Sequence, residues 1–193
     1  MNKIKDIVEN FPNLALSKED QEKLIRSNDA ELIGKYSQHH PFYKGNEITL
    51  VEVADEETIS KYVERYMLLD EDAQVALCRK ASDDLMKRYI EKYRVCKAAQ
   101  LELLKRGLLL HYIAKHSLYA SVQEEMVEEG DMDLIKAYIA HDKFDEGVLQ
   151  SLVVNRNLEL LRIYTKKHDL PDAIKVAVFN SGDVELFESC TGK

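Results

Sequence analysis

The chain has 193 residues, and 27 Lys and Arg stand against 35 Asp and Glu, which gives a formal net charge of −8. Only 7 Gly and 3 Pro are present, too few for the many tight turns of an all-β fold. Hydrophobic residues make up 45% of the chain but form no run of about 18, so we expect a folded, soluble protein without a membrane span.

The N-terminal residues 1–16 predict a capping helix. Ile4, Ile7, Val8 and Phe11 lie on one stripe of this helix, and charged residues occupy its other side. The segment has no continuous apolar stretch of the kind that secretion signals contain, so we expect a cytoplasmic protein. The three cysteines fit a reducing compartment, since an odd number cannot form a complete disulfide set.

From residue 17 onward the sequence repeats with a period of about 26 residues. Tyrosines recur at spacings of 26, 27, 23, 26 and 26 residues. They are Tyr36, Tyr62, Tyr89, Tyr112, Tyr138 and Tyr164, and Cys190 follows 26 residues after the last. The positions three residues before and six residues after each tyrosine are apolar in every repeat. Several columns in phase identify an internal repeat, which is typical of solenoid proteins.

Each repeat predicts a hairpin of two short helices. An apolar pair in the first half and an apolar stripe around the tyrosine in the second half form the two helix faces. Asn28, Gly130 and Gly182 suit the left-handed residue that ends a first helix. Seven residues before each tyrosine, except in the fourth repeat, stand residue types that cap helix N-termini. These are Asp29, Asp55, Ser82, Asp131, Asn157 and Asp183.

The patterns together predict an all-α fold, an α-α superhelix (solenoid) of roughly six to seven stacked hairpins in one domain. About six hairpins occupy residues 17–172, and residues 173–193 form a C-terminal capping repeat. Helices of about ten residues are not stable alone in water, so each hairpin must stack on its neighbours.

The fourth repeat is three residues shorter than the others and leaves two interpretations open. Lys105, Arg106 and Gly107 occupy its turn and supply no acidic cap. Either the turn is shortened, or one continuous helix runs from about residue 98 to 116. In the second case Gly107 costs about 1 kcal/mol relative to Ala.

Three segments resemble the start of the second helix in ankyrin repeats. They are residues 28–33 (NDAELI), 129–135 (EGDMDLI) and 181–187 (SGDVELF). The Thr-Pro-Leu-His opening of ankyrin repeats is absent, and 26 residues cannot hold the 33-residue ankyrin unit with its β-hairpin finger. The chain therefore resembles an ankyrin-like or short HEAT-like α-solenoid, and such families imply protein binding without catalysis.

A basic side chain stands three residues after every tyrosine. These residues, which we call the basic ladder, are His39, Arg65, Lys92, Lys115, His141 and Lys167. Our preferred interpretation is that they complement the negative ends of the second helices. The alternative is a positive rail that follows phosphates or an acidic peptide. Residues 79–106 favour the alternative, because nine bases against four acids give this segment a local balance of +5.

The densest acidic stretch lies in the fifth repeat. Glu124, Glu125 and Glu128 have helical spacing there, and no base occurs between residues 124 and 133. The stretch is either a solvated helix face or a docking surface for a basic partner.

The remaining polar columns have structural interpretations. We expect the tyrosines in the core. We expect the polar residues four positions after them to form hydrogen bonds to the turn of the next repeat, with ligand contacts as the alternative; they are His40, Tyr66, Tyr93, His116, Asp142 and His168. No catalytic triad, phosphate loop or zinc spacing occurs, so we expect no cofactor and no metal. We therefore predict a non-enzymatic module that binds another protein on the concave or edge face of a solenoid. Nucleic-acid binding along the basic ladder is the alternative, and self-association remains open.

Overall fold

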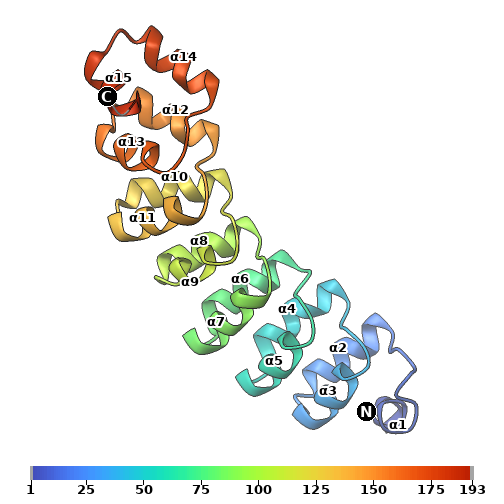
Figure 1. Cartoon of the computed structure of the whole chain (residues 1–193). Helices are drawn as coiled ribbons and strands as arrows, with labels where there is room; N and C mark the ends of the chain where they lie inside the picture. Colours follow the sequence, from blue (N-terminus) through green and yellow to red (C-terminus); the bar gives the residue numbers. More distant parts are fainter. Residues whose placement is uncertain (1, 192–193) are drawn as a thin grey trace. The chain divides into compact units, whose positions relative to one another are not determined.

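The structure is a computed structural model that describes residues 2–191 (Figure 1). Fifteen α-helices occupy this range and no β-strand occurs in it, which confirms the predicted all-α fold. The helices group into two compact units, Met1–Leu108 and Leu109–Lys193.

Unit 1 is a stack of helices in two layers. Its helices are α1 (Asn2–Asn10), α2 (Lys18–Arg26), α3 (Ala30–Ser37), α4 (Lys44–Val53), α5 (Glu56–Val63), α6 (Glu71–Lys80), α7 (Asp83–Lys92) and α8 (Lys97–Lys105). The first helices of the hairpins pack in the order α2, α4, α6, α8, and α1, α3 and α5 pack in order beside them (Figure 1). From α2 to α8 in the first layer, and from α1 to α5 in the second, each helix thus packs on the corresponding helix of the next hairpin.

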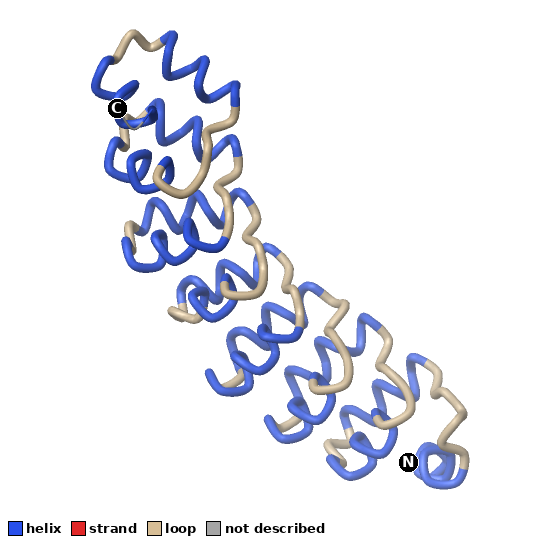
Figure 2. Tube along the Cα trace, viewed as in Figure 1, coloured by secondary structure: helices blue, strands red, loops and turns tan. Residues whose placement is uncertain are grey.

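Unit 2 repeats the same arrangement. Its helices are α9 (Leu109–Ile113), α10 (Ala120–Glu129), α11 (Met132–His141), α12 (Glu146–Val154), α13 (Leu158–Thr165), α14 (Asp172–Asn180) and α15 (Val184–Thr191). α10, α12 and α14 form one layer, and α9, α11, α13 and α15 form the other. In both units short turns join the helices of a hairpin, and longer linkers join one hairpin to the next (Figure 2).

The tyrosine column lies in the core, as predicted, with all six side chains buried. The apolar residue six positions later comes from a linker and packs between consecutive tyrosines. In unit 1 the Phe42 ring lies 5.4 Å from the Tyr36 ring and 5.2 Å from the Tyr62 ring. In unit 2 the Phe144 ring lies 5.6 Å from Tyr138 and 5.7 Å from Tyr164. Aromatic pairs at this distance attract one another, so linker and hairpin are joined in the core.

The predicted N-caps are confirmed in all six repeats that contain one. Each side-chain oxygen accepts a hydrogen bond from the backbone N–H three residues later, at 2.8–3.3 Å. Asn28, Gly130 and Gly182 have φ angles of 52°, 73° and 65°, so the predicted left-handed turn residues are also confirmed.

The fourth repeat contains a shortened turn, and the continuous helix over residues 98–116 is wrong. α8 ends at Lys105 and α9 begins at Leu109. Gly107 between them has φ = 70°, a left-handed conformation that costs glycine little. The Leu108 N–H donates to the Leu103 carbonyl at 2.9 Å, the bond that closes a helix C-terminus in the Schellman motif.

The two ends of the chain differ in what they expose. α1 buries Ile4 and Val8 and exposes its charged side, as a capping helix should. The prediction that Phe11 lies on the buried stripe of this helix is wrong. Phe11 follows the end of α1, where the chain turns, and its side chain is exposed. The predicted C-terminal capping repeat is the hairpin of α14 and α15, and it exposes apolar side chains. Residues 192–193 of that prediction lie outside the described residues.

Candidate functional site

A column of buried polar residues, absent from the sequence analysis, holds the linkers in position. Its members stand fifteen residues before four of the tyrosines and twelve before Tyr112 in the shortened repeat, and all are buried, whereas the apolar Leu149 stands fifteen residues before Tyr164. They are Gln21, Glu47, Gln74, Gln100 and Gln123. The signal was visible in the sequence, since these residues share the 26-residue period of the tyrosines.

Gln123 shows how the column works. Its Nε2 donates to the Tyr138 hydroxyl at 2.9 Å and to the Leu118 carbonyl at 3.2 Å, in the preceding linker. Its Oε1 accepts the Asp145 N–H at 2.7 Å, in the following linker. One side chain therefore ties two successive linkers to one hairpin. The buried amide is satisfied on both sides, which makes the arrangement specific as well as stable.

Glu47 is the one acid in this column. Its Oε2 accepts the Leu69 and Asp70 N–H groups, both at 2.7 Å, and its Oε1 accepts the Tyr62 hydroxyl at 3.3 Å. Burial raises the pKa of the Glu47 carboxyl, and the two backbone hydrogen bonds oppose this rise. Glu47 is therefore a structural carboxylate that fixes the linker before α6.

The polar residues four positions after the tyrosines are half-buried, but the hydrogen bonds of His40 and His168 reach the preceding part of the chain and not the turn of the next repeat, which corrects the prediction. Five of them place their ring 4.8–5.3 Å from the tyrosine ring of their own repeat in a tilted arrangement, as His40 does with Tyr36. The His40 Nε2 also lies 2.8 Å from the Pro12 carbonyl oxygen, and the His168 Nε2 lies 2.6 Å from the Ile139 carbonyl oxygen. The Nε2 atoms of His40 and His168 are therefore used in contacts between neighbouring parts of the chain.

The basic ladder is exposed at all six positions. His39, Arg65 and Lys92 belong to unit 1, and the other three belong to unit 2. Each stands at or just after the end of a second helix, where a positive charge complements the helix dipole. The Lys92 Nζ donates to the Glu64 carbonyl at 2.5 Å, so this side chain also bonds the end of α5 directly.

Several bases of residues 79–106 bind other parts of unit 1. The Lys80 Nζ donates to the Val51, Glu52 and Ala54 carbonyls at 2.8–3.1 Å, which closes the end of α4. Arg106, one repeat later, donates hydrogen bonds to groups at and after the end of α6. Its partners are the Cys78 and Ala81 carbonyls and the Asp83 carboxylate. Arg79 pairs with Glu102 at 2.7 Å. Much of the +5 segment thus serves contacts between repeats.

These bonds explain two turns that the sequence analysis did not predict. Ala54 and Ala81 follow α4 and α6 in an extended conformation, with ψ of 157° and 152°, where other repeats have a left-handed residue. An extended residue leaves the last helical carbonyls without the bonds of a left-handed cap. Lys80 and Arg106 supply donors to these carbonyls from the following repeat.

The acidic side chains Glu124, Glu125 and Glu128 are all exposed on α10. Exposure of the three side chains fits both the solvated face and the docking surface, so each stays a prediction.

A row of exposed apolar side chains lies on the linkers of unit 1. We define the linker edge as residues 11–17, 38–43 and 64–70, which precede α2, α4 and α6 (Figure 2). Leu14, Tyr43 and Leu69 follow one another on it, one per linker, with 54%, 51% and 59% of their surface exposed. His39 and Arg65 of the basic ladder stand on the same linkers. Tyr43 and Leu69, and likewise His39 and Arg65, recur at a spacing of 26 residues, so two successive linkers each combine an exposed apolar side chain with a base.

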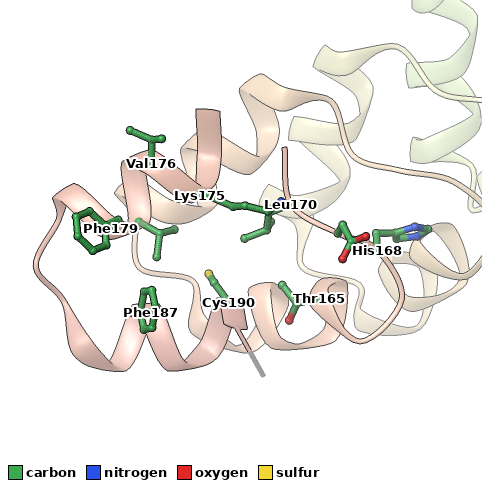
Figure 3. A pocket seen from close by; sticks show the side chains of 10 residues that line it. Thr165, His168, Leu170, Lys175, Val176, Phe179, Phe187 and Cys190 are labelled. Carbon is green, nitrogen blue, oxygen red and sulfur yellow. The ribbon is translucent and has the colours of Figure 1, made fainter. Parts of the chain in front are cut away.

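Unit 2 contains an open groove between α14 and α15. Its volume is about 570 Å³, and its lining includes Val176, Phe179, Phe187 and Cys190 (Figure 3). Phe179 and Val176 project from α14, and Phe187 and Cys190 project from α15. Cys190 occupies the tyrosine column, where the smaller side chain leaves space that a ring fills in the preceding repeats.

None of the helices in residues 2–191 has the length and apolar character needed to cross a bilayer. Within the same range, no three His, Cys, Asp or Glu side chains are gathered as metal ligands would be. Comparison of the chain with protein-family models, with curated proteins and with solved structures found no match.

Proposed function

We propose that the chain is a non-enzymatic protein-binding module whose linker edge in unit 1 binds a protein segment with acidic and apolar side chains. The observation that supports this most directly is the row of Leu14, Tyr43 and Leu69 beside the bases His39 and Arg65. Large apolar side chains exposed together on one surface mark interaction sites, and Tyr43 and Leu69 occupy equivalent positions of successive linkers. Tyrosine and arginine are also the residue types most often found at the centres of protein interfaces.

The column of buried polar residues described above supports the choice of this edge. Gln21 and Glu47 hold the backbone N–H groups of Tyr43 and Leu69 at 2.8 and 2.7 Å, so both exposed side chains start from fixed backbone. A surface that is already ordered loses little conformational entropy on binding, and this raises affinity. Carboxylates in the bound segment would then meet His39 and Arg65, which adds specificity and a faster association.

Nucleic-acid binding along the basic ladder is the alternative function, and it has less support. Arg106, Lys80 and Arg79 bond groups within unit 1, which reduces the number of bases that could follow phosphates. The net charge of −8 and the absence of Trp add nothing in its favour. The resemblance to ankyrin-like repeats and a cytoplasmic location also remain proposals, supported by the capped hairpins and by three cysteines without disulfide bonds.

Selection from a random-peptide phage library tests the proposal. We expect enriched peptides to combine Asp or Glu with Leu, Phe or Tyr. Fluorescence polarisation should then give at least about tenfold weaker binding to the double variant Tyr43→Ser, Leu69→Ser, a loss of about 1.4 kcal/mol. Val53→Ser, an exposed apolar residue at the opposite end of α4, is the matched control and should bind like the wild type.

Enrichment of Lys-rich and Arg-rich peptides, or equal binding to the double variant, would contradict the proposal. A parallel titration with labelled DNA and RNA at low salt separates the alternative. Binding at micromolar protein that is lost in Arg65→Ala, Lys92→Ala would favour nucleic acid instead.

A further inference from the structure

The last hairpin exposes side chains from columns that are otherwise buried. Phe179 and Phe187 are 74% and 42% exposed. Most residues of the two columns are buried in earlier repeats. Those in the Phe179 column are Ile25, Val51, Cys78, Leu104 and Val153, and those in the Phe187 column are Ile33, Ile59, Met86, Leu109, Ile135 and Leu161. The faces of α12 and α13 are covered by α14 and α15. The outer face of α14 and α15 therefore has the side chains of a stacking surface and no layer on it within the described residues.

The groove in this face is large enough to accept an aromatic ring. A cavity of about 150 Å³ binds benzene, and the groove measures about 570 Å³. Its floor contains Cys190 at the position where six repeats have a buried tyrosine ring. Phe179 stands at its rim, so the same face presents both a projecting ring and a space for one (Figure 3).

The first helix of unit 1, α1, does not offer a matching surface. α1 packs on α3 and buries Ile4 and Val8, while its charged side chains Lys5, Asp6 and Glu9 are exposed, and Glu9 pairs with Lys35 of α3 at 3.8 Å. Stacking the α14–α15 face on α1 of another copy would bury these charges against Phe179 and Phe187, which is unfavourable without partners. Association of the α14–α15 face with α1 of another copy is therefore disfavoured. Pairing of two α14–α15 faces is the remaining way for two copies to cover this face.

We propose that two copies of the chain pair through their α14–α15 faces around a two-fold axis, each Phe179 ring entering the groove of the other beside Cys190. A two-fold contact uses the same patch on both subunits, so the patch must complement itself. The ring and the groove satisfy this requirement in shape. Lys175 and Asp169 both line the groove and can pair reciprocally between the two copies, if Lys175 exchanges its exposed partner Asp172, at 3.1 Å on the same helix, for Asp169 of the other copy. The contact lies in unit 2 and is independent of the proposed linker-edge function.

Sedimentation velocity of the full chain tests the proposed dimer at protein concentrations from about 2 to about 200 μM. This range suits the micromolar dissociation constants expected of an interface with a small buried area. We expect the wild type to shift from monomer to dimer. Phe179→Glu should stay monomeric throughout with unchanged far-UV circular dichroism, because its side chain makes little contact within the monomer. Val154→Ser, an exposed apolar change on α12 outside the groove, should dimerise like the wild type.

Maleimide labelling gives a second readout. Cys190 should react more slowly as the protein concentration rises, whereas Cys96, also half-buried but in unit 1, should react at a constant rate. A wild type that stays monomeric, with Cys190 equally reactive at all concentrations, would overturn the proposal and leave the face to a helix of another protein. A dimer that persists in Phe179→Glu would overturn it in favour of another surface.

Discussion

Gln74 donates its Nε2 to the Leu68 carbonyl at 2.7 Å and accepts the Cys96 N–H through Oε1 at 2.6 Å. Replacing Gln74 with Leu keeps the volume but leaves both backbone groups buried without these partners. Each unsatisfied group costs about 1–3 kcal/mol, so we expect Gln74→Leu to lower the free energy of unfolding by about 2–4 kcal/mol. Urea denaturation followed by circular dichroism measures this change.

Gln38→Leu is the matched control, because Gln38 is exposed in the same unit, and it should change the unfolding free energy little. Equal effects of the two substitutions would mean that the buried column contributes nothing specific.

Glu47 gives the buried column a dependence on pH. Burial raises the pKa of its carboxyl in the folded state, so the folded state holds the proton more tightly than the unfolded state. The stability contribution of this proton linkage is complete below the unfolded pKa and is lost as pH rises through the folded pKa. Glu47→Gln removes the titration. We therefore expect the variant to gain stability relative to the wild type as pH rises from the ordinary glutamate pKa through the raised pKa of Glu47 in the folded state, measured by urea unfolding.

Glu52→Gln, on the exposed side of α4, controls for the loss of one negative charge. A constant difference between Glu47→Gln and the wild type over the whole pH range would contradict the assignment.

The sequence predicts the tyrosines better than it predicts the glutamines, for a physical reason. Tyr62 and Tyr138 share a helix face with Leu and Ile, so their burial follows from periodicity alone. The burial of Gln21 or Gln123 depends on partners, namely linker N–H groups and tyrosine hydroxyls, that come together only when hairpins stack. A polar column at the repeat period is the available signal, and its meaning needs the tertiary structure.

At the scale of helices and turns, two glycines allow a test with opposite signs. Gly107 has φ = 70° in the turn before α9, and Gly34 lies inside α3; a Cβ atom would meet nothing within 4 Å at either position. Gly107→Ala should lower the unfolding free energy by about 1–2 kcal/mol because of the left-handed backbone. Gly34→Ala should raise it by about 0.5–1 kcal/mol, since alanine favours helix. Urea midpoints measure both.

If both substitutions moved the midpoint in the same direction, the turn at Gly107 would not have the conformation described, and the continuous helix would return.

Local signals were sufficient for most elements. The N-caps such as Asp29 and Asp131 act within one turn of helix, so residue type and spacing predict them. The extended turns at Ala54 and Ala81 were not predictable, because the donors that compensate them, Lys80 and Arg106, arrive from the following repeat. The exposure of Phe179 was likewise not predictable, because burial at its position depends on another helix layer packed against α14, which no local pattern specifies.

At the scale of the whole molecule, composition limits the function without choosing a surface. The net charge of −8 and the +5 segment over residues 79–106 suggested two kinds of partner. In the folded chain, bases of that segment such as Lys80 and Arg106 bond backbone carbonyls, so a count of charges overstates what a ligand can use. The exposed row of the linker edge arises from linkers, whose exposure the repeat period does not reveal.

The most direct test of the binding function is affinity capture of the tagged chain from its source-cell lysate, with and without nuclease, analysed by mass spectrometry. The account predicts a stoichiometric protein that survives nuclease, is recovered equally with Val53→Ser, and is lost with Tyr43→Ser, Leu69→Ser. Recovery that disappears with nuclease, or that is the same for the double variant, would contradict it.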